Sequence, residues 1–254
     1  MWRRKFLASF VALIAFGTVA MTTAAQEHHG HSWGYVGADG PEHWGDLDPT
    51  FTACKVGLRQ SPIDIKGAKQ ADLPAIRFDY KPTPLRIINN GHTIQINYTS
   101  GSSITVGDRS YELKQFHFHH PSEEKINGKA FAMVVHLVHA DSQGEIAVVA
   151  VLLDTTGANQ LLESIWKHLP QVAGPEETFD QLQINAADLL PSNHSYYTFA
   201  GSLTTPPCSE GVTWFVLQAP KSISKEQADR FGKIYPDNAR PTQPLNGRDL
   251  TQSK

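Results

Sequence analysis

Two histidines in a segment with alternating aromatic residues constrain the fold of this chain more than any other feature. The segment is Gln115-Phe116-His117-Phe118-His119. In a β-strand, residues i and i+2 face the same side, so His117 and His119 would project together while the phenylalanines point to the opposite face. Polar groups on a buried sheet face are costly unless they have a partner. The pattern therefore predicts a strand that carries two candidate ligands.

A third histidine, His136, lies in a second apolar run over residues 134–139. The turn signals Pro121 and Asn127-Gly128 separate the two runs, so the second strand can return antiparallel to the first. That return would deliver a third imidazole beside the other two. Three neutral imidazoles on rigid strands form the protein half of a catalytic zinc site, whose fourth position stays open.

Two other interpretations of the histidines remain open at this point. A cupin-type metal site also contains His-x-His followed by a carboxylate, and Glu123 lies four residues after His119. Against a cupin, no glycine lies six residues before His117, and the run around His136 is hydrophobic rather than rich in Gly and Pro. Alternatively, the histidines are core residues whose ring nitrogens are bonded to backbone carbonyls.

Short strand-like runs dominate the chain, and turn signals such as Asn90-Gly91 separate them. We expect strands over residues 76–80, 85–89, 93–98, 103–106, 111–119, 130–139, 145–153 and 212–219. Helical spacing of apolar residues predicts helices over 159–169 and 224–234, the second opening with a capping-box pattern. Many strands, few helices and no βαβ rhythm favour a mainly β single domain with a mostly antiparallel sheet.

The N-terminus has the pattern of a secretory signal peptide. Arg3, Arg4 and Lys5 precede an apolar run over residues 6–20, and small residues lead up to Ala25. We expect cleavage after Ala25, followed by a flexible His-containing segment over 26–32 and one domain over 33–254. The apolar run of 15 residues is short for a membrane span of about 20. A periplasmic or secreted protein without a membrane anchor is therefore predicted.

Export changes how charge and cysteines are interpreted. Removal of residues 1–25 leaves 19 of the 22 basic residues against 25 acidic ones, a net charge of −6 with His neutral. No basic stripe indicates a nucleic-acid partner, and the sequence does not indicate an oligomeric state. In an oxidising compartment, Cys54 and Cys208 are expected to form one disulfide. Two buried free thiols are the alternative.

Eight motifs occur in an order that resembles the exported bacterial members of the α-class carbonic anhydrases, from Trp33 to about Leu250. They span residues 33–35, 40–44, 60–65, 89–92, 115–119, 136–139, 201–208 and 238–241. The resemblance implies a single mainly β domain around a central twisted, mostly antiparallel sheet of about ten strands, with small peripheral helices. It also implies a carbonate dehydratase, a zinc lyase that hydrates carbon dioxide reversibly to bicarbonate and a proton.

The resemblance also implies roles for individual residues. His117, His119 and His136 would bind Zn²⁺, and the zinc-bound hydroxide would attack carbon dioxide. Thr204 and Glu123 would orient that hydroxide, and His92 would act as the proton shuttle. The implied substrate-binding residues are Val138, Val148, Leu203, Thr204, Thr205, Val212 and Trp214. The residues that support the ligands or order water would be Tyr35, Asn90, Gln95, Gln115 as partner of His117, and the backbone of Asn238 as partner of His119.

Two positions depart from the family pattern. Val134 stands two residues before His136, where the family usually has a glutamate, so we expect His136 to lack a carboxylate partner and zinc to be held more weakly. Glu124 stands where a histidine is common, and its carboxylate would either raise the pKa of Glu123 or be neutralised by a partner that the sequence does not identify. A non-catalytic binding module of the same family is the rival interpretation. Such domains usually lose at least one zinc histidine, whereas this chain keeps all three.

Overall fold

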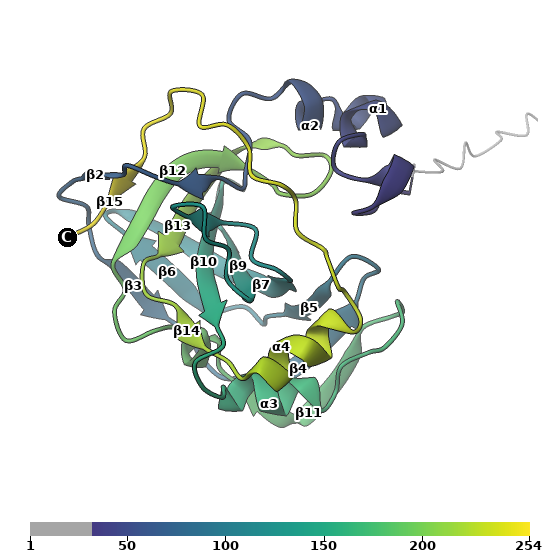
Figure 1. The fold of residues 1–254 in the computed structure, drawn as a ribbon. Helices are drawn as coiled ribbons and strands as arrows, with labels where there is room; N and C mark the ends of the chain where they lie inside the picture. Colours follow the sequence, from purple (N-terminus) through teal and green to yellow (C-terminus); the bar gives the residue numbers. More distant parts are fainter. Residues whose placement is uncertain (1–31) are drawn as a thin grey trace, which may run out of the picture. The chain divides into compact units, whose positions relative to one another are not determined.

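The computed structural model describes residues 32–254, and β-strands make up most of its regular structure (Figure 1). The expected signal peptide (1–25) and all but the last residue of the expected segment 26–32 lie outside the described residues. The strands are β1 (Asp64–Ile65), β2 (Lys69–Gln70), β3 (Ile76–Asp79), β4 (Thr83–Asn89), β5 (Ile94–Asn97), β6 (Ser103–Val106), β7 (Arg109–His119), β8 (Lys125–Ile126), β9 (Met133–Ala140), β10 (Ile146–Asp154), β11 (Glu177–Ile184), β12 (Tyr196–Ser202), β13 (Glu210–Leu217), β14 (Lys221–Ser222) and β15 (Thr251–Gln252).

The helices are few and short. They are α1 (Trp44–Leu47), α2 (Ala53–Val56), α3 (Gln160–Trp166) and α4 (Lys225–Gly232), together with the 3₁₀ turns η1 (Gly37–Asp39), η2 (Pro49–Phe51) and η3 (Ala186–Leu189). The predicted mainly β fold with small peripheral helices is confirmed. Among the described residues, no helix is long and apolar enough to cross a membrane.

One large sheet of thirteen strands organises the domain. Its main path runs β11-β4-β5-β7-β9-β10-β13-β12-β15-β2, while β3, β6 and β14 pair beside this path. Most neighbours are antiparallel, but β10 and β13 pair in parallel near the middle. β1 and β8 form a separate two-stranded parallel pair. The sheet thus agrees with the expected architecture, with more strands than the expected ten.

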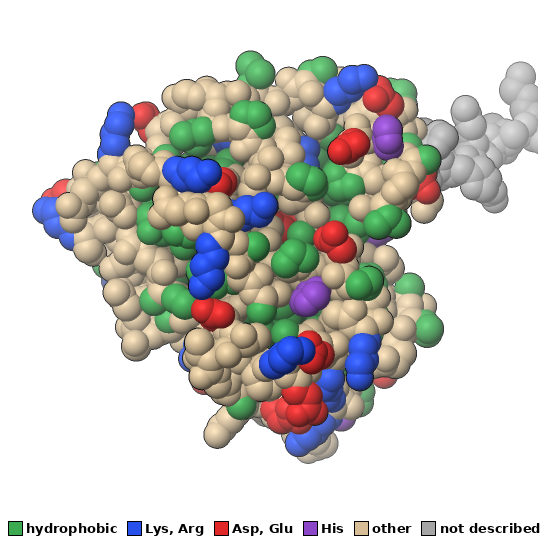
Figure 2. Space-filling view, in the orientation of Figure 1, with side chains coloured by type: hydrophobic (Ala, Val, Ile, Leu, Met, Phe, Trp, Pro, Cys, Tyr) green, Lys and Arg blue, Asp and Glu red, His purple; other side chains and the backbone are tan. Residues whose placement is uncertain are grey.

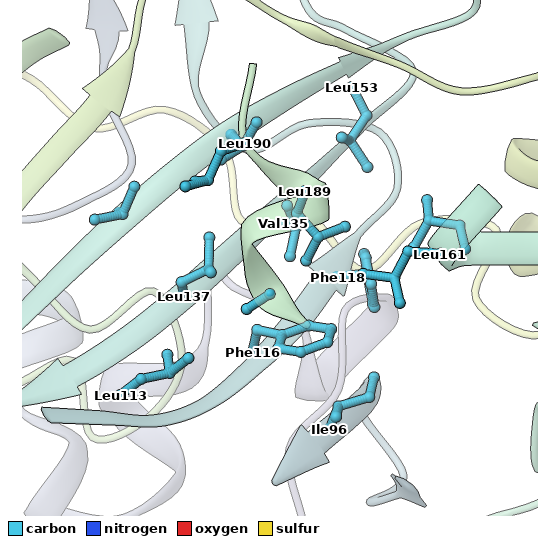
Figure 3. Packing of buried hydrophobic residues seen from close by; sticks show 14 of the residues in the cluster. Ile96, Leu113, Phe116, Phe118, Val135, Leu137, Leu153, Leu161, Leu189 and Leu190 are labelled. Carbon is cyan, nitrogen blue, oxygen red and sulfur yellow. The ribbon is translucent and has the colours of Figure 1, made fainter. Parts of the chain in front are cut away.

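The two faces of the central strands bury different sets of side chains. On one face, Phe116, Phe118, Val135 and Leu137 join the larger core cluster, where Leu189 of η3 also packs (Figure 3). The opposite face carries the three histidines and a smaller cluster of buried apolar side chains from β9, β10 and β13. Because β10 is buried on both faces, its sequence is a continuous apolar run rather than an alternating one.

The two longer helices α3 and α4 lie side by side at one end of the domain, away from α1 and α2 (Figure 1). The predicted capping box is present, because Ser224 accepts from the backbone N–H of Gln227 while the Gln227 side chain accepts from the Ser224 N–H. The side chain of Asn159 caps α3 by accepting from the N–H of Leu162. The Trp166 indole N–H donates to the Gln227 carbonyl at 2.8 Å and joins the two helices.

The predicted disulfide between Cys54 and Cys208 is present and joins α2 to the segment that precedes β13. That segment also contains Thr204 and Thr205, and the Cys208 N–H donates to the Thr205 carbonyl at 2.8 Å. The guanidinium of Arg240 donates to the Cys54 carbonyl at 3.1 Å. The disulfide is therefore part of the framework beside a predicted substrate-binding segment.

Candidate metal centre and active site

Strand register brings the three predicted histidines together. His117 of β7 and His136 of β9 are direct cross-strand partners, and His119 is the partner of Val134 one step further along the same face. The ligand nitrogens of the three histidines all lie within 4.8 Å of one another. His119 and His136 are each 1% exposed. The prediction that two antiparallel strands would gather three imidazoles on one face is confirmed.

Each imidazole is held by a hydrogen bond at one ring nitrogen. His117 Nδ1 lies 2.8 Å from Gln115 Oε1, and His119 Nδ1 lies 2.8 Å from the carbonyl oxygen of Asn238. A carbonyl oxygen can only accept, so each Nδ1 carries the hydrogen in these bonds. The Nε2 atoms of both rings then keep a lone pair. Such bonds fix both the tautomer and the ring orientation of metal-binding histidines.

Burial keeps the first two imidazoles neutral. It lowers the pKa of His117 to about 3, and it lowers the pKa of His119 well below the ordinary value. Nearby His136 lowers both pKa values further. Among the described residues, no hydrogen-bond partner meets the buried Nε2 of His119. A buried lone pair without a donor, beside two further imidazoles, is the donor set that a zinc ion takes.

Glu123 lies beside this centre as a buried carboxylate. Its Oε1 accepts the backbone N–H of Arg240 at 2.8 Å, while its Oε2 lies 3.5 Å from His119 Nε2 and 3.8 Å from His136 Nδ1. Burial raises the pKa of Glu123 to about 8, and the charge of Glu124 raises it further, whereas His136, Arg240 and Thr204 lower it. The side chain of Thr204 thus interacts with the Glu123 carboxylate, as the resemblance implied.

The predicted substrate-binding apolar residues form one wall next to His136. Val148, Val212 and Trp214 belong to a single buried cluster, and the partly buried Val138 and Leu203 pack against it. The Trp214 ring meets the His136 ring edge-on, with 4.9 Å between centroids. Val148 is the cross-strand partner of both Val138 and Trp214. The strands therefore place Val138, Val148, Val212 and Trp214 on the face that carries the histidines, and Leu203 packs against this group from the segment after β12.

Four of the predicted polar residues, Tyr35, Asn90, Gln95 and Gln115, line a cavity beside the histidines together with His92. This cavity of about 130 Å³ extends from the histidines and is lined by Trp33, Tyr35, Asn90, His92, Thr93, Gln95, Gln115, His117, His119 and Thr205. Asn90 Oδ1 accepts from the backbone N–H groups of His92 and Thr93 at 3.0 Å, which fixes the turn that presents His92. The buried hydroxyl of Tyr35 has no hydrogen-bond partner among the described residues.

Comparison with known proteins agrees with this geometry. The family model described as eukaryotic-type carbonic anhydrase matches residues 39–254. The chain belongs to this family. A carbonic anhydrase of Neisseria gonorrhoeae is 45% identical over 249 residues, 96% of each chain, and one of a Nostoc strain is 44% identical over 85% of this chain and 84% of its own. The α-carbonic anhydrase of Thermovibrio ammonificans, solved with the inhibitor sulfanilamide, superposes with a TM-score of 0.84 at 43% identity, covering 89% of this chain and all of the other.

The expected α-class carbonic anhydrase is therefore confirmed, and with it the reaction of this enzyme class, the reversible hydration of carbon dioxide. The chain retains a complete histidine triad in a buried site. Lysine, arginine and acidic side chains are intermingled on the face shown in Figure 2, with no extended patch of one sign.

One expectation about this carbonic anhydrase is wrong. His136 does not lack a carboxylate partner, because both oxygens of Glu124 lie 3.1 Å from its Nε2. Val134 does occupy the same sheet face as His136, where it packs in the apolar cluster. The carboxylate belongs instead to the segment before β8. The spacing of residues along the sequence does not indicate a contact between Glu124 and His136. Burial alone would lower the pKa of His136, but Glu124 and then Glu123 raise it above the ordinary value.

His120 follows the ligand strand directly but faces away from the centre. Its Nδ1 lies 3.0 Å from the Pro236 carbonyl oxygen, and its backbone N–H donates to the Asn238 side chain at 2.8 Å. These contacts agree with strand parity, which places the side chain of His120 on the opposite side from His117 and His119. The same Asn238 side chain donates to the carbonyls of His92 and Phe118, both at 3.0 Å. Asn238 thus connects the turn of His92 to the ligand strand.

Proposed function

We propose that this carbonic anhydrase is zinc-dependent and that His117, His119 and His136 are its zinc ligands. The observation that carries the proposal is the gathering of three imidazoles, two buried and that of His117 partly buried, each already hydrogen-bonded at its other ring nitrogen. The available nitrogens are then Nε2 of His117, Nε2 of His119 and Nδ1 of His136. When bound, zinc supplies a Lewis acid that brings the pKa of a coordinated water close to 7.

Thr204 and Glu123 would orient the nucleophile. The Thr204 hydroxyl donates to the Glu123 carboxylate, which leaves its oxygen lone pair to accept the hydrogen of the attacking O–H. The Arg240 N–H holds Oε1 in place and, with Thr204, favours the ionised form of Glu123, and the charge of a bound Zn²⁺ would favour that form further. An O–H that is fixed in this way directs its remaining lone pair at the substrate carbon, which lowers the entropic cost of attack.

The apolar wall would hold carbon dioxide. The substrate has no net charge and no dipole, so the side chains of Val138, Val148, Leu203, Val212 and Trp214 can accept it without losing a polar partner. Thr205 lines the same cavity as the ligands His117 and His119, and we place it with Thr204 at the substrate end. Bicarbonate is charged and is released to water, because an apolar wall offers it no compensation.

His92 would carry the product proton to buffer. It lies on the cavity that reaches His117 and His119, and its backbone is fixed by Asn90 and Asn238. An imidazole titrates close to neutral pH and therefore suits proton transfer in both directions. Tyr35, Asn90 and Gln95 place polar groups along the same cavity and would order the hydrogen-bonded path.

We also propose that the protein is exported and acts in the periplasm or outside the cell. The disulfide between Cys54 and Cys208 supports this location, because disulfides persist in oxidising compartments. Residues 1–25 would be removed on export, and residues 33–254 would form the enzyme domain. Mass spectrometry of protein recovered from the periplasm or medium tests the proposal. A mature chain that begins at Gln26 is expected, and an intact Met1 in that fraction would contradict it.

The decisive experiment combines metal analysis with a carbon dioxide hydration assay. We expect about one zinc per chain, loss of hydration when a chelator removes the metal, and recovery when zinc is added back. His119→Ala should neither hold stoichiometric zinc nor catalyse hydration. Glu226→Gln, which changes an exposed side chain on α4, serves as the control. Stoichiometric zinc without hydration would indicate a non-catalytic binding module instead.

A further inference from the structure

The carboxylate of Glu124 is fully buried, but the reaction proposed above gives it no role. Glu124 is 0% exposed, and His136 Nε2 is the side-chain partner that the structure gives to both of its oxygens, at 3.1 Å each. A buried carboxylate is strongly destabilising unless it is paired and hydrogen-bonded. We therefore expect Glu124 to have a role that depends on its negative charge beside His136.

The backbone around Glu124 is fixed from several directions. The Ser122 hydroxyl donates to the Glu124 carbonyl at 2.8 Å and accepts the Phe131 N–H at 2.8 Å. The next residue, Lys125, begins β8, and its backbone N–H donates to the Ile63 carbonyl at 3.3 Å. Glu124 is thus held at the start of a paired strand, so its side chain reaches His136 from a rigid position.

The two adjacent glutamates meet opposite nitrogens of the same ring. Glu123 Oε2 lies 3.8 Å from His136 Nδ1, whereas Glu124 lies on the Nε2 side. An ionised carboxylate can only accept, so His136 Nε2 carries the hydrogen and Nδ1 keeps its lone pair. That lone pair faces the other two histidines. Glu124 therefore selects the His136 tautomer that can bind a metal in this site.

We propose that Glu124 is the positioning residue for His136, in the place that a side chain at position 134 would otherwise take. Val134 lies two residues before His136 on the same sheet face and is fully buried in the apolar cluster. A carboxylate at position 134 would approach His136 along its own strand, whereas Glu124 approaches it from the segment before β8. The apolar side chain at 134 and the acid at 124 are thus complementary, because Glu124 supplies the carboxylate on the Nε2 side of His136.

The inference rests on the proposed zinc site, and zinc release tests it without using activity. Zinc-loaded protein is mixed with excess dipicolinate, and the rate of metal transfer is measured for the wild type, Glu124→Gln, Glu124→Ala and the exposed control Glu226→Gln. Loss of an outer hydrogen-bond partner typically costs 10–100-fold in metal affinity or activity. We expect release from Glu124→Gln and Glu124→Ala to be about 10–100 times faster than from the wild type, and release from Glu226→Gln to be unchanged.

A relocated carboxylate provides the second test. The double variant Glu124→Ala/Val134→Glu moves the acid to the strand of His136. It should release zinc markedly more slowly than Glu124→Ala. Wild-type release from Glu124→Gln would overturn the proposal, as would a double variant that releases zinc as fast as Glu124→Ala. Failure of the wild type to bind zinc would instead contradict the proposed zinc site itself.

Melting of the metal-free variants separates positioning from a general loss of stability. A positioning role predicts that zinc raises the melting temperature of the wild type by more than that of Glu124→Gln, because a ligand that binds more tightly stabilises the folded state more at the same concentration. A merely structural role predicts a lower melting temperature without zinc and the same increase on zinc addition. The second pattern would overturn the proposal.

Discussion

The imidazole of His92 lies flat against the indole of Trp33, with 3.6 Å between ring centroids and 5° between ring planes. Trp33 in turn meets the rings of Tyr35 and Trp44 edge-on, so it forms a fixed platform. Burial lowers the pKa of the half-buried His92 below its ordinary value. At neutral pH the imidazole is therefore mostly uncharged and available to accept a proton.

Replacing His92 tests the proton path. His92→Ala should lower the turnover of carbon dioxide hydration by roughly tenfold or more in dilute buffer, because proton transfer then lacks a positioned acid–base group. A small imidazole buffer at high concentration should restore most of the loss. Stopped-flow hydration assays over a range of buffer concentrations measure both effects. If His92→Ala matched the wild type in every buffer, His92 would have no shuttle role.

Replacing Trp33 tests the platform separately. Trp33→Ala keeps the imidazole but exposes it to water. Because burial is what lowers the pKa of His92, this pKa should rise toward the ordinary value near 6.5. NMR titration of the His92 ring in the two proteins measures the difference. A pKa that stays in place or falls would show that contact with Trp33 does not set it.

Thr204 offers a test of nucleophile orientation with a matched pair of variants. Thr204→Ala removes the hydroxyl that joins the nucleophile to Glu123, and kcat/KM for hydration should fall about 100-fold, the usual scale for one preorganised hydrogen bond in an active site. Thr204→Ser keeps the hydroxyl and should retain most of the activity. Zinc content should be equal in both variants. Equal activity of Thr204→Ala and Thr204→Ser would exclude the role.

Strand parity and chain reversal were sufficient to predict that the three histidines lie together. The alternation around His117 and His119 fixes one face of β7, and the turn-rich segment before His136 returns β9 antiparallel to it. These are local properties of the sequence. The pairing of β10 with β13 in parallel could not be predicted, because the register of distant strands depends on the whole sheet.

Besides the two-residue strands, two longer strands, β11 and β12, were missed for a similar reason. β11 exposes most of its side chains at the edge of the sheet and contains an irregularity in its pairing with β4, so it lacks the apolar alternation that marks a strand. β12 contains the small residues Ala200 and Gly201, which weaken the strand pattern.

The contact of Glu124 with His136 joins residues on different elements. The periodicity of apolar residues within one strand or helix does not predict a contact between two elements.

The disulfide leads to a stability prediction. Reduction of the Cys54–Cys208 bond, or its replacement in Cys54→Ser/Cys208→Ser, should lower the free energy of unfolding by about 2–5 kcal/mol, because the bond restrains a long loop of the unfolded chain. Urea denaturation with and without a reducing agent measures the change in midpoint. The double variant should not respond to the reducing agent. An unchanged wild-type midpoint after verified reduction would contradict the prediction.

A buried histidine outside the metal centre predicts how stability depends on pH. His139 is fully buried and shares a 2.8 Å hydrogen bond with the Tyr80 hydroxyl, and burial lowers its pKa to about 3. An unfolded histidine titrates near 6.5. Between these values the unfolded chain binds a proton that the folded chain does not. The titration of His139 therefore does not change the free energy of unfolding above about pH 6.5. As the pH falls from 6.5 toward 3, this titration lowers the free energy of unfolding by a few kcal/mol in total.

The variant His139→Phe removes this titration and leaves the Tyr80 hydroxyl without its partner, which should cost about 1–3 kcal/mol at every pH. The difference in unfolding free energy between the metal-free wild type and His139→Phe should therefore be largest near pH 7 and shrink as the pH is lowered to 4. The other histidines titrate in both proteins, so their contributions cancel in this difference. Urea denaturation at a series of pH values measures it, and two curves that stay parallel from pH 7 to pH 4 would show that His139 does not carry the effect.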